Sequence, residues 1–227
     1  MNGILLVDKP KGWTSFDVVN YIRGMVARVE GKKPRNVKVG HTGTLDPAAT
    51  GLLVICVGKA TKQVPLLIKQ DKTYEVELTL GKTSTTQDQE GVITDVSTIQ
   101  PPENEVQKVI ASFVGTSQQV PPAFSALKVG GKRAYDLARA GKQVVLEPRT
   151  ITIEWIKDVV YVYPTVRCTA RVGSGTYIRA LARDIGEQLG CGAYMSELRR
   201  TEIGTENVAQ AYAVSSLTEE LLQKILV

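Results

Sequence analysis

The chain has 227 residues, of which 43% are hydrophobic and 22% charged, so it is long enough to bury a substantial core. Its net charge of +5 is a weak indication of a polyanionic partner. No apolar run approaches the roughly 18 residues of a membrane helix, and no basic segment followed by an apolar run opens the chain. We therefore expect a cytoplasmic protein without a membrane span or a signal peptide.

Cysteine and histidine usage excludes several kinds of site. The three cysteines have the spacing of neither a zinc site nor a disulfide framework. The single histidine, His41, rules out a histidine-rich metal site, and no G-x-S-x-G segment supplies a serine nucleophile. We expect no metal.

The first third of the chain predicts a strand, a capped helix and a basic loop. Residues 3–7 have the pattern of a short buried strand. Thr14, with Asp17 three residues later, predicts the start of a helix with apolar residues at helical spacing. Residues 31–36 are basic and loop-like, and a short strand is expected at Val37.

The middle of the chain predicts a strand, a helix and an arm. Alternation over 74–80 predicts a half-buried strand, and residues 82–91 are polar and loop-like. A helix is expected to follow Pro102. Residues 119–142 combine paired prolines, paired glycines and basic side chains, which predicts a protruding arm; an ordinary hairpin fits this pattern equally well.

The last third continues the mixture of strands and helices. Residues 143–163 hold β-branched runs, 166–172 alternate as a half-buried strand, 176–189 read as a helix closed by a glycine, and a small helix is expected near 216–225. Strands that alternate and adjoin one another favour an α+β fold with a mixed, mostly antiparallel sheet, in a single domain over 1–227.

The stretch 40–53 is the most unusual segment of the chain. It contains His41, three glycines and Asp46, which is the only acid between Glu30 and Asp71. A lone carboxylate among glycines and small hydroxyl residues is a plausible place for chemistry. Asp followed by Pro also favours the start of a helix. The local sequence alone therefore favours Asp46 as a helix cap over a catalytic role. His41 alone reads as a polar loop residue.

Tyr74, Arg179 and the glycine-containing segment 173–175 are further candidates for function, and each also has an ordinary structural explanation. Tyr74 lies on the apolar face of its predicted strand and reads as a core tyrosine. Arg179 lies one turn into a helix among apolar neighbours, where an arginine reaches solvent or pairs with an acid. Residues 173–175 precede that helix and could hold a phosphate, although they lack the nucleotide-binding pattern.

Basic residues gather in three parts of the chain. Each cluster is either solvated surface or a contact to a polyanion. The clusters lie in 32–38, 128–142 and 199–200.

Six motifs in order are far more specific than any one of them. Together they resemble the catalytic domain of the TruB-type tRNA pseudouridine synthases over nearly the whole chain. The motifs are 5–10 with 12–15, 40–47, 72–74, 121–133, 175–179 and 198–201.

The resemblance implies a pseudouridine-synthase fold and an enzyme that isomerises uridine 55 in the TΨC arm of tRNA. The target base is flipped out of the folded loop, and no cofactor is required. By this resemblance Asp46 is the catalytic aspartate and Tyr74 stacks on the target base and helps to remove the C5 proton. Arg179 pairs with the catalytic carboxylate.

The resemblance also implies residues that bind the substrate. His41 helps to hold the tRNA loop with its target base flipped out, and Tyr177 and Leu198 belong to the base pocket. Residues 121–142 form the arm that closes over the RNA. Lys9 belongs to a motif that supports the site structurally.

One departure from the family pattern concerns the C-terminus. Many bacterial members carry an additional RNA-binding domain of the PUA type, for which this chain has no room before residue 227. We expect tRNA binding to depend on the catalytic domain and its arm, in a monomer without an obligate protein partner. Three alternatives remain open: an RNA-binding protein without chemistry, a synthase with another RNA target, and a glycosidase, which usually needs paired acids.

Overall fold

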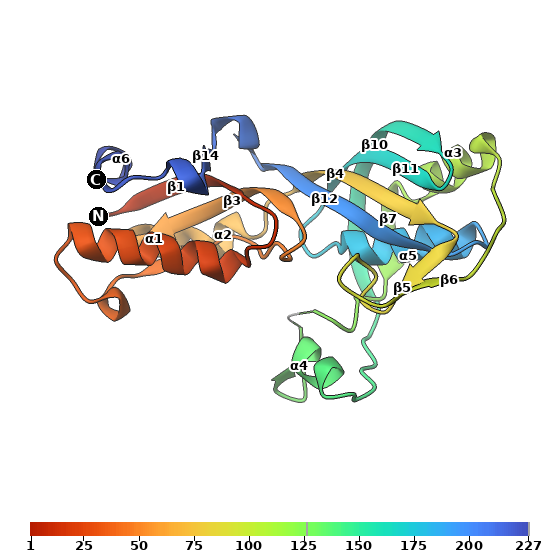
Figure 1. Cartoon of the computed structure of the whole chain (residues 1–227), viewed down its shortest axis with the longest axis horizontal. Coiled ribbons are helices and arrows are strands. Elements are labelled where there is room, and N and C mark those ends of the chain that lie inside the picture. The colour runs from red at the N-terminus through yellow and green to blue at the C-terminus, as the bar shows by residue number, and fades with distance from the viewer. Residues whose placement is uncertain (126, 227) are drawn as a thin grey trace. The chain divides into compact units, whose positions relative to one another are not determined.

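The chain divides into two units in the computed structural model, which describes residues 1–125 and 127–226 (Figure 1). The first unit comprises Met1–Tyr74 and the chain from Leu198 onward, and the second comprises Glu75–Glu197. The strands β4 (Lys72–Leu80) and β12 (Ala193–Ile203) contribute residues to both units.

The first unit contains short strands around one long helix. The chain folds in this order: β1 (Gly3–Lys9), α1 (Ser15–Val29), a 3-10 turn η1 (Pro34–Asn36), β2 (Val39–His41), β3 (Thr50–Val57), η2 (Gly58–Gln63) and α2 (Val64–Leu67). The C-terminal part adds β13 (Glu206–Asn207), η3 (Val208–Gln210), β14 (Tyr212–Ala213), η4 (Val214–Ser216) and α6 (Glu219–Ile225).

The sheet of the first unit is mixed. β1 and β2 each run antiparallel to β3, whereas β14 lies parallel to β1 and β12 parallel to β3. Helix α1 begins at the predicted capping box of Thr14 and Asp17. Its apolar side packs on alternate residues of β1 and β3, and the core residues include Leu5, Ile22 and Ile55, which are fully buried.

The parallel contact between β3 and β12 requires a glycine. Gly51 has a φ of +102° and pairs with Arg200 of β12. A Cβ at position 51 would overlap the backbone of Arg200. Only glycine therefore allows the two strands to approach at this point.

The second unit has an antiparallel sheet with a helix beside it. Strands β4, β11 (Thr165–Val172), β10 (Arg149–Val162) and β7 (Gly115–Gln119) lie in that order, and β10 runs antiparallel to both of its neighbours. The other elements are β5 (Lys82–Ser84), β6 (Ile93–Asp95), α3 (Glu103–Ser112), β8 (Lys128–Val129), β9 (Lys132–Arg133), α4 (Ala134–Arg139) and α5 (Ile178–Gln188).

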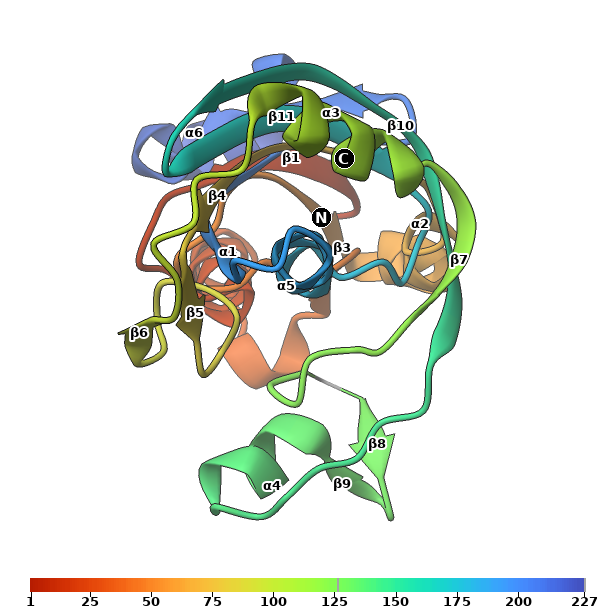
Figure 2. The same cartoon turned by 90° about the vertical axis from the view of Figure 1, so that its right-hand side faces the viewer.

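The predicted arm is an insertion between two paired strands. Gln119 at the end of β7 lies opposite Arg149 at the start of β10, so residues 120–148 leave and rejoin the sheet at one point. Figure 2 shows β8, β9 and α4 set apart from this sheet and from α5. Strands β8 and β9 form a hairpin through Gly130 and Gly131, both at positive φ. The hairpin is therefore present within this segment, and closure of the segment on nucleic acid stays a prediction.

The α+β fold with a mixed, mostly antiparallel sheet is confirmed, and several local predictions are wrong. Val37 ends η1, and the expected strand begins instead at Val39. The polar segment 82–91, expected to be a loop, begins with β5, which pairs with β6. No helix among residues 1–125 and 127–226 has the length and apolar character to cross a membrane.

Candidate active site

Asp46 lies in a tight turn between β2 and β3. The N–H of Ala49 donates to the carbonyl of Asp46 at 3.1 Å, which closes a four-residue turn with Pro47 in its second position. No helix begins here, so the interpretation of Asp46 as a helix cap is wrong. Pro47 favours the turn because its ring fixes φ near the value that this position requires.

Ser15 holds the residue before Asp46. Its side chain is buried in the first turn of α1, accepts a hydrogen bond from the N–H of Leu45 at 2.8 Å and lies 3.0 Å from the carbonyl of Leu45, to which it donates. One hydroxyl therefore satisfies both backbone groups of Leu45, whose side chain is itself buried.

Lys9 and Gly12 hold the residue after Asp46. The carbonyl of Pro47 accepts from the N–H of Gly12 at 2.8 Å and from Nζ of Lys9 at 3.4 Å. Lys9 is fully buried, and its ammonium also donates to the carbonyl of Trp13 at 2.6 Å. This geometry agrees with the supporting role that the resemblance implies for Lys9.

Arg200 fixes the loop from β12. Its side chain is 1% exposed, and Nε donates to the carbonyl of Leu52 at 2.7 Å while Nη2 donates to that of Gly43 at 3.0 Å. Arg199 is partly exposed and pairs with Asp8 at 2.8 Å. The third basic cluster is thus not a solvated surface, because Arg200 is committed to the backbone of its own unit.

Two further basic side chains lie close to the same loop. Nδ1 of His41 accepts from the N–H of Gly43 at 3.3 Å, and burial, together with the charge of Arg200, holds the pKa of His41 below its usual value. Burial and then Arg200 lower the pKa of Lys72 to about 8. A Cβ built on Gly43 would lie 3.5 Å from both Arg200 and Lys72. Positive charge of this kind favours the ionised form of a nearby carboxylate.

Tyr74 and Leu198 belong to the first unit as well. Tyr74 of β4 is 7% exposed and Leu198 of β12 is 8% exposed. The predicted alternation of β4 is confirmed, since Tyr74, Val76 and Leu78 are buried and Glu75 is exposed. The roles of Tyr74 and Leu198 toward a base stay predictions.

Arg179 lies in the second unit, in the first turn of α5. It is buried, and Nη1 lies 3.3 Å from a carboxylate oxygen of Asp88. Nη1 also donates to the carbonyl of Thr86 at 3.1 Å, and Nη2 to that of Phe124 at 2.9 Å. The pairing of Arg179 with Asp46 stays a prediction.

Asp88 was missed in the sequence. It lies in the polar segment 82–91 and is 2% exposed, and its carboxylate accepts from the hydroxyl of Thr86 and from the N–H of Glu90 at 3.0 Å. An acid among polar neighbours looks like a solvated loop residue, so no local signal marks it.

Tyr177 connects the start of α5 to the base of the arm. Its N–H donates to Oε1 of Gln119 at 2.9 Å, and its carbonyl accepts from Nε2 of Gln119 at 3.2 Å. Arg183, one turn beyond Arg179 on α5, donates to the carbonyl of Val120 at 3.0 Å. The first residues of the arm are therefore tied to the helix that carries Arg179.

Metal-binding chemistry finds no support within the described part of the chain. No group of histidine, cysteine and acidic residues there could hold a metal ion.

A solved structure resembles the whole fold. The structure described as a Cbf5-Nop10-Gar1 complex contains a chain that matches with a TM-score of 0.68 and 28% identity over 97% of the present chain. The present chain spans only 54% of that longer chain.

Sequence comparisons identify the family. The family described as TruB family pseudouridylate synthase (N terminal domain) matches residues 31–178, and the tRNA pseudouridylate synthase B C-terminal domain matches 179–225. The tRNA pseudouridine synthase B of Clostridium kluyveri is 43% identical over 100% of this chain and 76% of its own length. That of Phocaeicola vulgatus is 44% identical over 97% of this chain and 94% of its own length. The chain therefore belongs to the TruB family of pseudouridylate synthases.

Proposed function

We propose that this protein isomerises uridine 55 in the TΨC loop of tRNA to pseudouridine, with Asp46 as the catalytic carboxylate and without a cofactor. The family supports the reaction class, and the relatives named above are tRNA pseudouridine synthases. The observation that carries the assignment of Asp46 is its turn, in which the residues before and after the carboxylate are both fixed by buried side chains.

The reaction only rearranges atoms. The bond between N1 of uracil and C1′ of the ribose breaks, the base turns, and C5 becomes bonded to C1′. The proton on C5 then leaves, and N1 gains one, so that no atom or electron is gained or lost overall. A carboxylate and a proton acceptor are therefore sufficient in principle.

The rigid turn suits this chemistry. A carboxylate whose backbone is fixed before the substrate arrives needs little reorganisation as charge develops at the sugar. Lys72 and Arg200 place positive charge beside Gly43 of the same loop. Arg179 is proposed to pair with Asp46 when the site is complete.

The target base must leave the folded tRNA loop to reach Asp46. In this proposal Tyr74 and Tyr177 offer aromatic faces for the extruded base, Leu198 lines its pocket, and His41 holds the loop in the flipped state.

The arm is proposed to close over the tRNA. Lys128, Lys132 and Arg133 are exposed in its hairpin, and Arg139 lies over the ring of Tyr135 at 5.6 Å. A basic, aromatic segment of this kind suits RNA. The protein is proposed to act as a cytoplasmic monomer, as one domain and without a protein partner.

The main test is the mapping of pseudouridine in an unmodified tRNA transcript by carbodiimide labelling and primer extension. Wild type is expected to give a stop at uridine 55, and Asp46→Asn none. The control is Asp95→Asn, which makes the same change at an exposed carboxylate. Turnover by Asp46→Asn contradicts the assignment, release of free uracil indicates a glycosidase, and a stop elsewhere indicates another target.

A second prediction concerns the hydroxyl of Tyr74. Tyr74→Phe keeps the ring, so tRNA binding is expected to remain, while most product formation is lost if the hydroxyl helps to remove the C5 proton. Binding is measured by filter retention and product by the same mapping. Full activity of Tyr74→Phe would show that the hydroxyl transfers no proton.

A further inference from the structure

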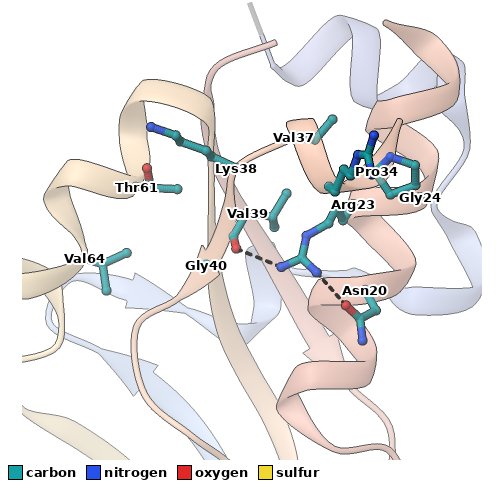
Figure 3. A pocket seen from close by; sticks show the side chains of 11 residues that line it. Asn20, Arg23, Gly24, Pro34, Val37, Lys38, Val39, Gly40, Thr61 and Val64 are labelled. Carbon is teal, nitrogen blue, oxygen red and sulfur yellow. Dashed lines mark hydrogen bonds between the residues drawn. The ribbon is translucent and has the colours of Figure 1, made fainter. Parts of the chain in front are cut away.

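Two hollows of the first unit lie beside the segment that joins α1 to β2. The larger has a volume of about 820 Å³, and the smaller of about 320 Å³. Val37, Lys38 and Thr61 line both, so the two hollows share part of their wall. Figure 3 shows the larger one, with Arg23 and Asn20 of α1 on one side and Lys38 and Thr61 on the other.

The lining is strongly basic, and folding brings its charges together from separate parts of the chain. Helix α1 contributes one cation, the segment after it three, and η2 two. We call this surface the basic groove and define it by Arg23, Lys32, Arg35, Lys38, Lys59 and Lys62.

One acid lies in this lining, and it is already committed. Glu30 lines the smaller hollow, accepts from the N-terminal ammonium and pairs with Lys32 at 3.0 Å. These bonds lower the pKa of Glu30, the N-terminus having the larger effect. Glu30 therefore does not neutralise the remainder of the basic groove.

Most of the cations are available to a ligand. Arg35, Lys38, Lys59 and Lys62 are exposed, and the described part of the chain offers none of them a carboxylate within ion-pair distance. Four solvated cations on a concave surface attract a polyanion more strongly than single charges on a flat face.

Arg23 differs because it is pre-oriented. It donates to the side chain of Asn20 at 2.7 Å and to the carbonyl of Val39 at 3.4 Å. Its guanidinium also lies 5.8 Å from the ring centroid of Phe16, whose side chain is 59% exposed. An exposed aromatic ring beside a fixed arginine is typical of surfaces that contact nucleic acid.

We propose that the basic groove binds the phosphate backbone of the substrate RNA away from the target nucleotide. The inference rests on the proposed function. The charges are distributed over the linings of two adjoining hollows, which suits a polymer of phosphates better than a single anion. Gly40 lines the larger hollow, and the chain continues directly into His41 and the turn of Asp46. The larger hollow is thus lined by a residue that lies six positions before Asp46 in the chain.

The test measures tRNA binding against salt concentration. Arg35→Gln with Lys38→Gln removes two exposed charges of the groove in an Asp46→Asn background, so that no turnover changes the RNA. We expect affinity to fall on the order of tenfold and the slope of log affinity against log salt to flatten by about 1.5, since each phosphate contact contributes roughly 0.7 to 0.9.

The matched control is Lys108→Gln with Lys224→Gln, which removes the same charge from exposed sites outside the groove. This control is expected to bind like its parent. Equal binding and an equal salt slope for the two double variants would overturn the inference. Failure of the proposed function is distinguishable, because a wild-type protein that makes no pseudouridine can still show the groove-dependent loss of tRNA binding.

A second readout separates the groove from the chemistry. In the otherwise wild-type enzyme, Arg35→Gln with Lys38→Gln is expected to leave the single-turnover rate at saturating tRNA unchanged while raising the tRNA concentration needed for half saturation. A lower rate at saturation with unchanged binding would show that the groove acts in catalysis and does not hold RNA.

Discussion

The two regions that carry the proposed catalytic residues are held in different ways. The turn of Asp46 is fixed through its backbone by Lys9, Ser15 and Arg200, all within the first unit. The side chain of Arg179 has contacts that include the carboxylate of Asp88 and two carbonyls of the second unit. Contacts within the first unit therefore fix the backbone on both sides of Asp46.

The orientation of Arg179 depends in addition on the arm. A carbonyl acceptor of Arg179 belongs to Phe124, near the start of residues 120–148, and Gln119 binds the residue that caps α5. A movement of the first arm residues would thus change the hydrogen bonds of Arg179. We therefore propose that RNA bound to the arm orients Arg179, whereas the backbone of Asp46 is fixed before the RNA binds.

The largest expected effect tests whether Arg200 holds the turn of Asp46. Arg200→Met removes a buried hydrogen bond to the carbonyl of Leu52 and a part-buried one to that of Gly43. Each is worth about 1–3 kcal/mol when its partner is lost, so the free energy of unfolding should fall by roughly 2–6 kcal/mol. Urea denaturation followed by circular dichroism measures this loss.

Arg199→Met is the matched control on the same strand. Its ion pair with Asp8 is partly exposed, and such pairs contribute less than about 1 kcal/mol. Equal losses for Arg199→Met and Arg200→Met would show that the buried arginine does not hold the turn.

The next largest effect tests whether Asp88 orients Arg179. Asp88→Asn keeps an acceptor for Thr86 but removes the charge that holds Arg179, so the single-turnover rate is expected to fall on the order of 100-fold, as for a misplaced catalytic group. The tRNA affinity should change little, whereas the free energy of unfolding is also expected to fall, because the buried guanidinium of Arg179 loses a charged partner.

Asp95→Asn again serves as the control, because the carboxylate of Asp95 is exposed in the same unit. An Asp88→Asn enzyme that retains the full rate would show that the orientation of Arg179 does not limit the reaction, and the proposed coupling to the arm would then have no catalytic consequence.

The sequence predicts the parts of the fold that follow simple periodicity. The capping box at Thr14, the alternating strand through Tyr74 and the helix after Tyr177 were all expected, and each is present. The resemblance also identified the family correctly. Its six motifs occur in a fixed order, and they contain glycines and prolines that shape the backbone as well as the proposed catalytic side chains.

The sequence does not predict features that arise from tertiary burial of charge. Strand β12 was not expected, because Arg199 and Arg200 interrupt its apolar pattern; Arg200 is nevertheless buried, since backbone carbonyls of β3 and its loop receive its donors. Asp88 was missed for the same reason, since only the fold brings Arg179 to it.

The smallest expected effect concerns His41 and tests whether the turn is tuned electrostatically. Burial and Arg200 hold the pKa of folded His41 below the 6.5 of the unfolded chain. Between these two values the unfolded chain binds more protons, so the free energy of unfolding should decrease as the pH falls through about 6.5. His41→Asn keeps an acceptor for the N–H of Gly43 but cannot titrate, so its stability should decrease less over the same range. Urea denaturation without RNA at pH 7.5 and pH 5.5 measures both slopes. If the two slopes are equal, the pKa of His41 is the same in the folded and unfolded chains. Burial and the charge of Arg200 would then have no net effect on the protonation of His41.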